Sequence, residues 1–132
     1  MGKSASGKDH IYARLAAHEG LGLKKLVLYT TRPIRAEEEN GKQYYFVDDK
    51  KLEEFRSSGN LIEARAYHTV HGIWNYFTAD DGSVDLRKTS YLAIGTLESY
   101  QNLKAYYGAA ALCPIYVEVE DGERLKRAIA RE

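Results

Sequence analysis

The chain has 132 residues, of which 44% are hydrophobic and 29% charged, a composition that excludes disordered, collagen-like and coiled-coil proteins. Nineteen basic residues balance nineteen acidic ones, so the net charge indicates neither a nucleic-acid nor a membrane partner. A single cysteine, Cys113, and the lack of an apolar run long enough to span a membrane favour a cytoplasmic protein. The composition leaves the oligomeric state open.

The first predicted elements are a helix, a strand and a loop. Residues 8 to 19 carry apolar side chains at helical spacing, and glycines follow them. Residues 26 to 29 form a short apolar run typical of a buried strand. The polar stretch from 30 to 42 has no apolar face, so we expect a loop there.

The middle third of the chain is rich in aromatic residues. We expect a strand at 44 to 47, a short helix capped by Asp48, and strands at 61 to 67 and 73 to 78. Nine of the 15 aromatic side chains lie from Tyr29 to Phe77. This region is therefore predicted to be a small β-rich unit with an aromatic core.

The last third returns to alternating strands and helices. Strands are predicted at 91 to 94 and 113 to 119, on either side of a helix through residues 97 to 104, and a final helix begins near Asp121. Strands separated by helices predict a parallel sheet of the doubly wound α/β class.

The opening loop, from Gly2 to Lys8, matches most of the Gly-x-x-x-x-Gly-Lys pattern of a P-loop. In such a loop the backbone N–H groups point at phosphate oxygens, and the lysine reaches the β and γ phosphates. Asp9 stands where the pattern has a Ser or Thr that helps to hold Mg²⁺, and a carboxylate can also bind magnesium. A glycine-serine loop that merely caps a helix is the alternative, but the spacing favours phosphate binding.

Two arginines and one glutamate stand out in the middle third. Arg32 and Arg35 follow a predicted strand, at the edge where open α/β sheets bind ligands, and guanidinium groups bind phosphate bidentately. Two solvated surface arginines are the alternative. Glu63 interrupts an apolar strand, and a buried carboxylate needs a partner. Two N–H groups of guanine would satisfy it, as would an ion pair with Arg65 or Lys51.

In this order the motifs resemble those of guanylate kinase, a family of P-loop nucleoside monophosphate kinases. The family carries a glycine-rich loop, Thr-Thr-Arg-x-x-Arg, Glu-x-x-Gly, Tyr-x-Phe-Val and Phe-Ile-Glu, and the matching residues here are 2–8, 30–35, 38–41, 44–47 and 61–63. The resemblance implies an α/β fold of the P-loop nucleoside triphosphate hydrolase-like type. Its parallel sheet would have helices on both faces and carry a small β-rich monophosphate-binding insert.

The resemblance also implies a division of the chain. The nucleotide-binding core would comprise residues 1–29 and 80–120, the monophosphate-binding insert residues 30–79, and the start of a lid residues 121–132. A complete family member has a strand before the loop and further chain after the last helix. We therefore expect this chain to be truncated at both ends and its loop to lack the anchor of that strand.

The activity implied is ATP-dependent transfer of the γ-phosphoryl group to GMP, giving GDP and ADP, with Mg²⁺ as cofactor and the two nucleotides as partners. The catalytic cations would be Lys8, Arg32, Arg35 and the lid arginines Arg127 and Arg131, although an exposed basic helix face also explains the last two. The ATP phosphates would be held by Gly2, Ser4, Ser6, Gly7, Lys8, Asp9 and His10, with Asp9 as the candidate metal ligand. GMP would be held by Thr30, Arg32, Arg35, Tyr44, Glu63, Tyr67, Trp74 and Asn75.

The chain departs from the family pattern at three places. Ala93 and Gly95 replace the aspartates of a Leu-Asp-x-Asp motif that serves the magnesium and monophosphate sites. Leu28 stands where a base-reading serine is common. The family's Tyr-Gly-[Ser/Thr] turn is expected at 74 to 76, after a two-residue insertion, where Asn75 would replace the lost donor.

These departures leave two alternative hypotheses about the function open. One is a binding module similar to the guanylate-kinase-like domains of scaffold proteins, which take a phosphorylated ligand in the monophosphate site. Those domains generally lose the phosphate-binding loop, whereas Lys8 and its glycines persist here. The other is a related P-loop kinase with a different phosphorylated acceptor, against which Glu63 argues.

Overall fold

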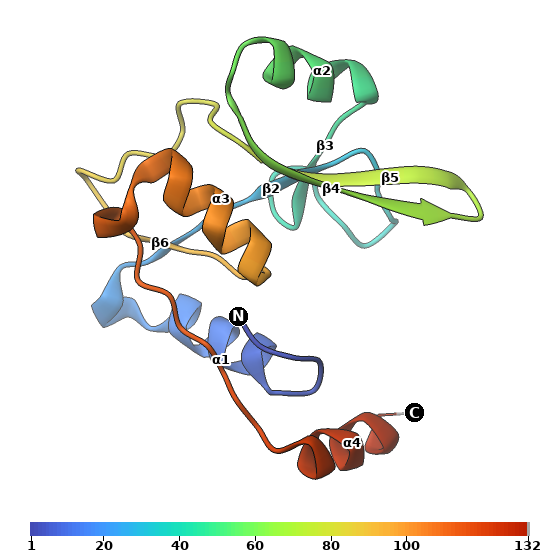
Figure 1. The fold of residues 1–132 in the computed structure, drawn as a ribbon, viewed down its shortest axis with the longest axis vertical. Helices are drawn as coiled ribbons and strands as arrows, with labels where there is room; N and C mark the ends of the chain where they lie inside the picture. Colours follow the sequence, from blue (N-terminus) through green and yellow to red (C-terminus); the bar gives the residue numbers. More distant parts are fainter. Residues whose placement is uncertain (132) are drawn as a thin grey trace. The chain divides into compact units, whose positions relative to one another are not determined.

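The computed structural model describes residues 1–131 and is a mixed α/β structure (Figure 1). The chain divides into two compact units. The middle unit comprises residues 26–87, and the terminal unit comprises residues 1–25 together with the chain from residue 88 onward. None of the helices within residues 1–131 is long and apolar enough to cross a membrane. Glu132, the last residue of the predicted lid segment, lies outside the described residues.

The middle unit is a four-stranded mixed sheet with one helix, in the strand order β3-β2-β5-β4. Strand β2 runs parallel to β3 and antiparallel to β5, and β5 forms an antiparallel hairpin with β4. The elements are β2 (Leu28–Thr30), β3 (Tyr44–Phe46), α2 (Asp49–Ser57), β4 (Leu61–Thr69) and β5 (Gly72–Ala79).

The core of the middle unit is aromatic, as the composition predicts. Phe77 is fully buried, and the ring of Tyr29 stacks on it with the ring centroids 5.1 Å apart. Phe55 meets Tyr29 edge-on at 5.1 Å, because α2 carries its apolar face, with Leu52, onto the sheet. Asp48 caps α2 as expected, since its side chain accepts the backbone N–H of residue 51 at 3.0 Å.

The hairpin of β4 and β5 sorts its side chains onto two faces. Directly paired residues of an antiparallel ladder share a face, and successive residues alternate. One face carries Ala64 opposite Phe77, on the core side. The other carries three pairs that lie in a row along the strands: Glu63 with Thr78, Arg65 with Tyr76, and Tyr67 with Trp74. A β-bulge between Leu61 and Glu63 precedes this row.

Within residues 1–131, the terminal unit contains short strands, three α-helices and two short 3-10 helices, labelled η1 and η2. Strands β1 and β6 pair in parallel, and a single parallel bridge joins Gly2 to Val117. The elements are α1 (Lys8–Ala17), η1 (Glu19–Leu21), β1 (Lys24–Lys25), β6 (Tyr91–Leu92), α3 (Leu97–Tyr107), η2 (Ala109–Ala111) and α4 (Asp121–Ala130).

The predicted parallel sheet is only partly present in the described chain. The α/β class is confirmed, but the expected strand at 113–119 is wrong, since only Val117 forms a bridge in that segment. Ile115 and Tyr116 are 57% and 47% exposed, and the backbone pairing described for their segment is with Met1 and Gly2. The predicted strand at 91–94 shortens to two residues.

The start of the opening loop is joined to residues 115–117 by backbone hydrogen bonds. The Met1 amino group donates to the carbonyl of Ile115 at 2.8 Å, and the N–H of Val117 donates to the carbonyl of Met1 at 2.8 Å. Gly2 sits in this bridge, where a Cβ atom would lie 2.8 Å from both Ser6 Oγ and the carbonyl oxygen of Val117. One isolated bridge and two hydrogen bonds therefore hold the start of the loop to residues 115–117.

Candidate functional site

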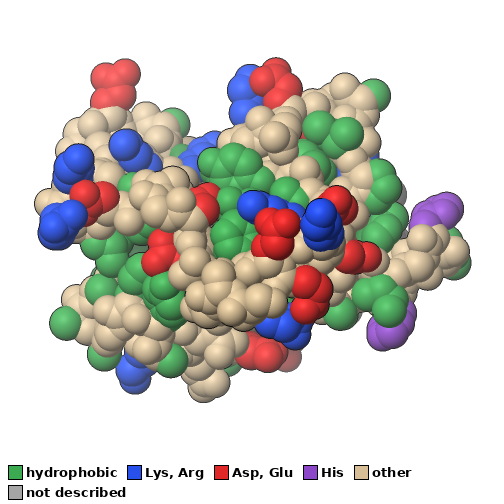
Figure 2. Space-filling view, turned by 90° about the horizontal axis from the view of Figure 1, so that it is seen from above, with side chains coloured by type: hydrophobic (Ala, Val, Ile, Leu, Met, Phe, Trp, Pro, Cys, Tyr) green, Lys and Arg blue, Asp and Glu red, His purple; other side chains and the backbone are tan. Residues whose placement is uncertain are grey.

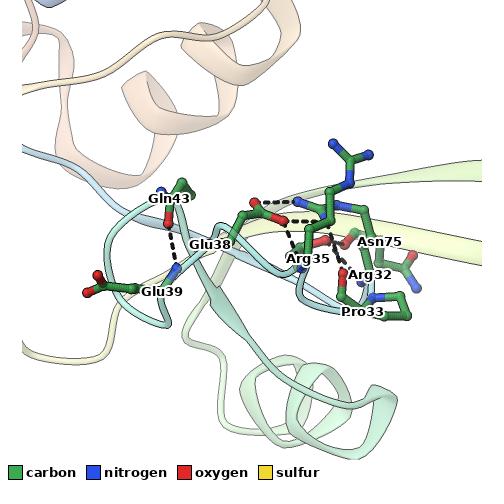
Figure 3. Close-up of polar contacts among 8 residues, drawn as sticks. Arg32, Pro33, Arg35, Glu38, Glu39, Gln43 and Asn75 are labelled. Carbon is green, nitrogen blue, oxygen red and sulfur yellow. Dashed lines mark hydrogen bonds and ion pairs between the residues drawn. The ribbon is translucent and has the colours of Figure 1, made fainter.

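The loop after β2 holds a buried arginine in a carboxylate clamp (Figure 3). Arg32 is 4% exposed, and its Nη1 and Nη2 atoms donate to Glu38 Oε1 and Oε2 at 2.8 and 2.9 Å. Nη1 also donates to the carbonyl oxygen of Pro33 at 2.9 Å. Two parallel N–H···O bonds fix the guanidinium plane as well as its position. The clamp therefore orders the loop from within.

Aromatic rings and charge reinforce this clamp. The guanidinium of Arg32 lies 5.7 Å from the ring centre of Tyr44 and 5.4 Å from that of Phe46, within cation–π range. Hydrogen bonds to Glu38, and to a lesser extent to Tyr76, raise the pKa of Arg32. The same bond from Arg32 holds the pKa of the Glu38 carboxyl below its ordinary value. Both groups are therefore charged at neutral pH.

Arg35 lies in the same loop but differs from Arg32 in exposure. Its backbone N–H donates to Glu38 Oε1 at 3.1 Å, which ties the turn to the clamp. Its side chain is exposed, and Figure 3 shows its guanidinium pointing away from Glu38. Of the two arginines, Arg35 is the one whose charge faces solvent and is available to an anion.

Glu63 is a buried carboxylate on the face of the hairpin that also carries Arg65 and Tyr67. Its side chain is 2% exposed, and Oε1 accepts a hydrogen bond from the hydroxyl of Thr78 at 3.1 Å. Oε2 lies 3.5 Å from Nε of Arg65, close enough for an ion pair. Neither Oε2 nor that Nε makes a hydrogen bond to another described residue, although both atoms are buried. The carboxylate thus keeps one unsatisfied acceptor.

Three tyrosines join the arginine loop to the hairpin. The rings of Tyr44 and Tyr76 meet edge-on with centroids 5.5 Å apart, and those of Tyr67 and Tyr76 at 5.6 Å. Burial raises the pKa of Tyr44, so its hydroxyl stays a neutral donor. Since Tyr76 pairs across the hairpin with Arg65, the cluster connects the Arg32 clamp with the Glu63 carboxylate.

The loop of the terminal unit begins helix α1. Ala5 and Gly7 have φ angles of 60° and 86°, in the left-handed region, and the carbonyl of Gly7 accepts the N–H of Ile11 at 3.1 Å. Lys8 is half-buried, while Asp9 and His10 are exposed in the first turn of the helix. The hydroxyl oxygen of Ser6 is buried and makes no hydrogen bond within residues 1–131.

Helix α4 places two arginines against this loop. Nη1 of Arg124 donates to the carbonyl of Ser4 at 3.2 Å, and Nη1 of Arg127 donates to that of Ala5 at 3.4 Å. Arg124 also binds Asp121, and this bond lowers the pKa of the Asp121 carboxyl. Arg131 is exposed at the end of the helix. Figure 2 shows basic and acidic side chains interspersed on the face it presents.

Sequence comparison identifies the family. The sequence model described as guanylate kinase matches residues 1–81, more than half of the chain. The chain belongs to the guanylate kinase family. The matched range includes the opening loop, the Arg32 clamp, Glu63 and Thr78.

Curated guanylate kinases are similar over longer or shorter stretches. That of Porphyromonas gingivalis is 32% identical over 111 residues, which cover 83% of this chain and 57% of the relative. That of Wolbachia pipientis is 37% identical over 71 residues, covering 53% of this chain and 35% of the relative. This chain thus spans about half, or less, of the length of the relatives it matches. The solved guanylate kinase of Anaplasma phagocytophilum is 19% identical, with a TM-score of 0.47 over 98% of this chain and 80% of that one.

Two side chains at the guanylate kinase-like site were not predicted from the sequence. The ring of Tyr76 contacts those of Tyr44 and Tyr67, and the hydroxyl of Thr78 donates to Glu63. Both lie on β5, the strand that also contains residues 74 to 76. The Tyr-x-Thr spacing was the available signal. Arg124 was also missed, and its only signal was its position one turn before Arg127 on a basic helix.

The remaining predicted residues of the middle unit lie around the site rather than in one cluster. Thr30 is buried, donates to the carbonyl of Asn75 at 3.0 Å and accepts the N–H of Arg32 at 3.1 Å. The Asn75 side chain reaches Asp49 at 3.5 Å, and its residue occupies the hairpin face opposite to Glu63. Trp74 stacks with His71 near the hairpin tip, with centroids 6.2 Å apart.

Proposed function

We propose that the chain carries the two phosphate-binding regions of an ATP-dependent guanylate kinase, which transfers the γ-phosphoryl group of ATP to GMP and yields GDP and ADP. The observation that carries the proposal is the buried Glu63, which keeps an unsatisfied oxygen on the same unit as the ordered arginine loop and the tyrosine cluster. A buried carboxylate with an open acceptor requires donors, and the N1 and N2 hydrogens of guanine are such donors.

The acceptor nucleotide is assigned to the middle unit, as the monophosphate-binding insert. Arg35 would bind the GMP phosphate with its exposed guanidinium, and the hydroxyls of Tyr44 and Tyr76 would donate to the remaining phosphate oxygens. Arg32 would act mainly by holding this loop through Glu38, and would add its positive charge to the field at the phosphate. Glu63 would read the base, with its orientation fixed by the Thr78 hydroxyl.

The donor nucleotide is assigned to the loop from Gly2 to Lys8 and the amino-terminal end of α1. A helix amino terminus with free N–H groups favours phosphate oxygens, and Lys8 would add its charge there. Arg127 and Arg131 would belong to a lid that begins at residue 121. This assignment implies a P-loop fold, in which a parallel sheet has helices on both faces. Its nucleotide-binding core would comprise residues 1–29 and 80–120.

Magnesium is the expected cofactor of this reaction. Asp9 is an exposed carboxylate beside Lys8 in the first turn of α1, which fits a cation bound mainly by water and substrate phosphates with one protein carboxylate. When bound, the metal would offset the phosphate charge. The composition further supports a cytoplasmic location, which we propose together with ATP and GMP as partners.

The chemistry requires no covalent intermediate. Two anionic substrates must be aligned, so the protein contributes orientation and positive charge. Lys8 and the lid arginines would neutralise charge on the phosphates of ATP. Arg35 would do so on the phosphate of GMP, while Glu63 and the tyrosines hold the acceptor base and phosphate. Closure of the lid would exclude water, which otherwise diverts ATP to hydrolysis.

A coupled assay with ATP, Mg²⁺ and each common nucleoside monophosphate tests the proposal on the full reading frame. GMP is expected to be the preferred acceptor. Lys8→Ala should lower turnover roughly 100- to 1,000-fold, as does removal of one preorganised charge in other sites. Lys50→Ala, on the exposed side of α2, is the matched control and should leave turnover unchanged. Absence of turnover with every monophosphate would contradict the proposal.

One departure supports a second candidate, a binding module for phosphorylated ligands. Ala93 and Gly95 replace family aspartates that serve catalysis, while the acceptor region keeps its arginines and tyrosines. Under this candidate, a phosphopeptide would bind through Arg35, and Lys8→Ala would leave that binding intact. Measuring the affinity of the unmodified protein and of Lys8→Ala for a phosphopeptide and for GMP distinguishes the two candidate functions.

A further inference from the structure

The Glu63–Arg65 pair is unusual because both partners are left incompletely satisfied. Glu63 Oε2 and Arg65 Nε lie 3.5 Å apart, both are buried, and neither makes a hydrogen bond within the described chain. An unmade hydrogen bond in a buried site destabilises the protein. A ligand that supplies a donor to Glu63 Oε2 and an acceptor to the Arg65 guanidinium would provide both missing hydrogen bonds.

The three polar atoms along this edge form an ordered array. Glu63 Oε1, which already accepts from Thr78, has a second lone pair, Oε2 is an open acceptor, and the Arg65 guanidinium is a donor. The array therefore reads acceptor, acceptor, donor. The matching edge reads donor, donor, acceptor, which is the order of the amino group, the N1 hydrogen and the O6 carbonyl of guanine.

Arg65 lies where it can contact a bound base as well as form an ion pair with the Glu63 carboxylate. Residues two apart in a strand share a face and lie about 7 Å apart, so Arg65 stands beside Glu63 on the same face of the hairpin. Its side chain is 22% exposed, compared with 2% for that of Glu63. A base approaching from solvent therefore meets the guanidinium first, and a turn of this long side chain uncovers Oε2 while its N–H groups stay within reach.

We propose that Arg65 is a specificity-determining residue, whose guanidinium donates to the O6 carbonyl of the acceptor base while Glu63 accepts from N1 and N2. This rests on the proposed function and names the base edge that the same site reads. Guanine satisfies all three positions of the array. Hypoxanthine, which lacks the amino group, satisfies two. Adenine, with an acceptor at N1 and a donor at N6, satisfies none in the same orientation. The expected order of affinity is GMP, then IMP, then AMP.

The test compares GMP with 6-thio-GMP, in which sulfur replaces O6, by isothermal titration of the full chain without ATP. The unmodified protein should bind GMP roughly 10- to 100-fold more tightly than 6-thio-GMP, the range for one hydrogen bond to a charged group. Arg65→Met should lose most of that ratio, and Arg65→Lys should keep part of it. Because the ratio is measured within one protein sample, a change in the folded fraction does not affect it.

Arg56→Met, an exposed position on α2 paired with Glu53, is the matched control and should keep the full ratio. An unchanged ratio in Arg65→Met overturns the proposal, as does tighter GMP binding by that variant, which would mean that Arg65 only occupies the carboxylate. If the unmodified protein binds no purine monophosphate, the proposed function fails and this inference fails with it. The first two outcomes leave the proposed function standing.

Discussion

The two units of the chain differ in what they bury. The buried apolar side chains of the described chain all belong to the middle unit, together with buried Thr30, Arg32, Glu63 and Thr78. Among the described residues of the terminal unit, the buried ones are two serines, Ser6 and Ser99. Leu125 and Ile129 on α4 are 62% and 64% exposed. The middle unit is thus built on a packed core, whereas the terminal unit is held by backbone pairing and helix ends.

This difference shows how stability and charge placement are related. A guanidinium or carboxylate can be held in one orientation only where packed neighbours exclude water and fix its partners. Arg32 and Glu63 meet that condition in the middle unit. The arginines of α4 instead contact loop carbonyls at the surface, where each contact contributes little. We therefore expect amide hydrogen exchange to be slow in the middle unit and faster in the terminal unit.

The largest test of the comparison is Phe77→Ala. Phe77 is fully buried against Tyr29, so the change should destabilise the middle unit by about 3–5 kcal/mol. Denaturant unfolding followed by the fluorescence of Trp74, the only tryptophan of the chain, reports on this unit. Leu125→Ala is the control from the terminal unit and should change that transition by less than about 0.5 kcal/mol. Equal effects would show that the units do not differ in packing.

A smaller, pH-dependent change is expected for Glu38→Gln. The folded-state pKa of Glu38 is lowered by Arg32, so the carboxylate stabilises the protein above its ordinary pKa of 4.5. That stabilisation is lost as the pH falls through the lower, folded-state value. The variant should therefore be less stable at pH 7 and should show a flatter decline in stability below pH 4.5.

Thermal unfolding between pH 3 and pH 7 measures this effect. Glu54→Gln, which breaks an exposed pair with Lys51, is the control and should follow the unmodified protein closely. A parallel acid decline in Glu38→Gln and the unmodified protein would mean that the clamp does not contribute to the stability of the middle unit.

The smallest expected effects come from two matched helix caps. Asp48 accepts the N–H of Lys51 at the start of α2, and Thr96 accepts that of Ser99 at the start of α3, at 3.0 and 3.1 Å. Asp48→Ala and Thr96→Ala should each cost about 1 kcal/mol of helix stability. Hydrogen exchange should show the first loss throughout the middle unit, because α2 carries two core side chains. The second should stay within α3, and a spread beyond it would contradict the comparison.

Local patterns predicted much of the fold. The helices beginning at Lys8, Asp49, Leu97 and Asp121 were found from spacing and caps, since these signals lie within a few residues. The hairpin was found from its two apolar runs. The strand at 113–119 was predicted wrongly because a strand is formed by its neighbours, and its sequence does not tell which neighbours are present.

The residues of the candidate site also divide into those predicted from local sequence and those that depend on tertiary contacts. Glu63 was noticed because a carboxylate in an apolar strand is anomalous on its own. The Arg32–Glu38 clamp was not predicted, since it depends on how a polar loop folds back across six residues. Thr78 was missed because the partner of Glu63 is set by cross-strand register and not by order along the chain. Residues that act through tertiary pairing leave weak linear signals.

The alternation of faces in the β4–β5 hairpin constrains how the protein can evolve in length. Glu63 faces Thr78 because pairing continues without interruption to the turn at Thr69 and Gly72. Adding one residue to each strand leaves this opposition intact, whereas a net change of one residue shifts one strand and turns its side chains to the other face. Homologues are therefore expected to vary in hairpin length by even numbers of residues. The sequence at the tip can change while Glu63 stays opposite Thr78 at the base of the hairpin.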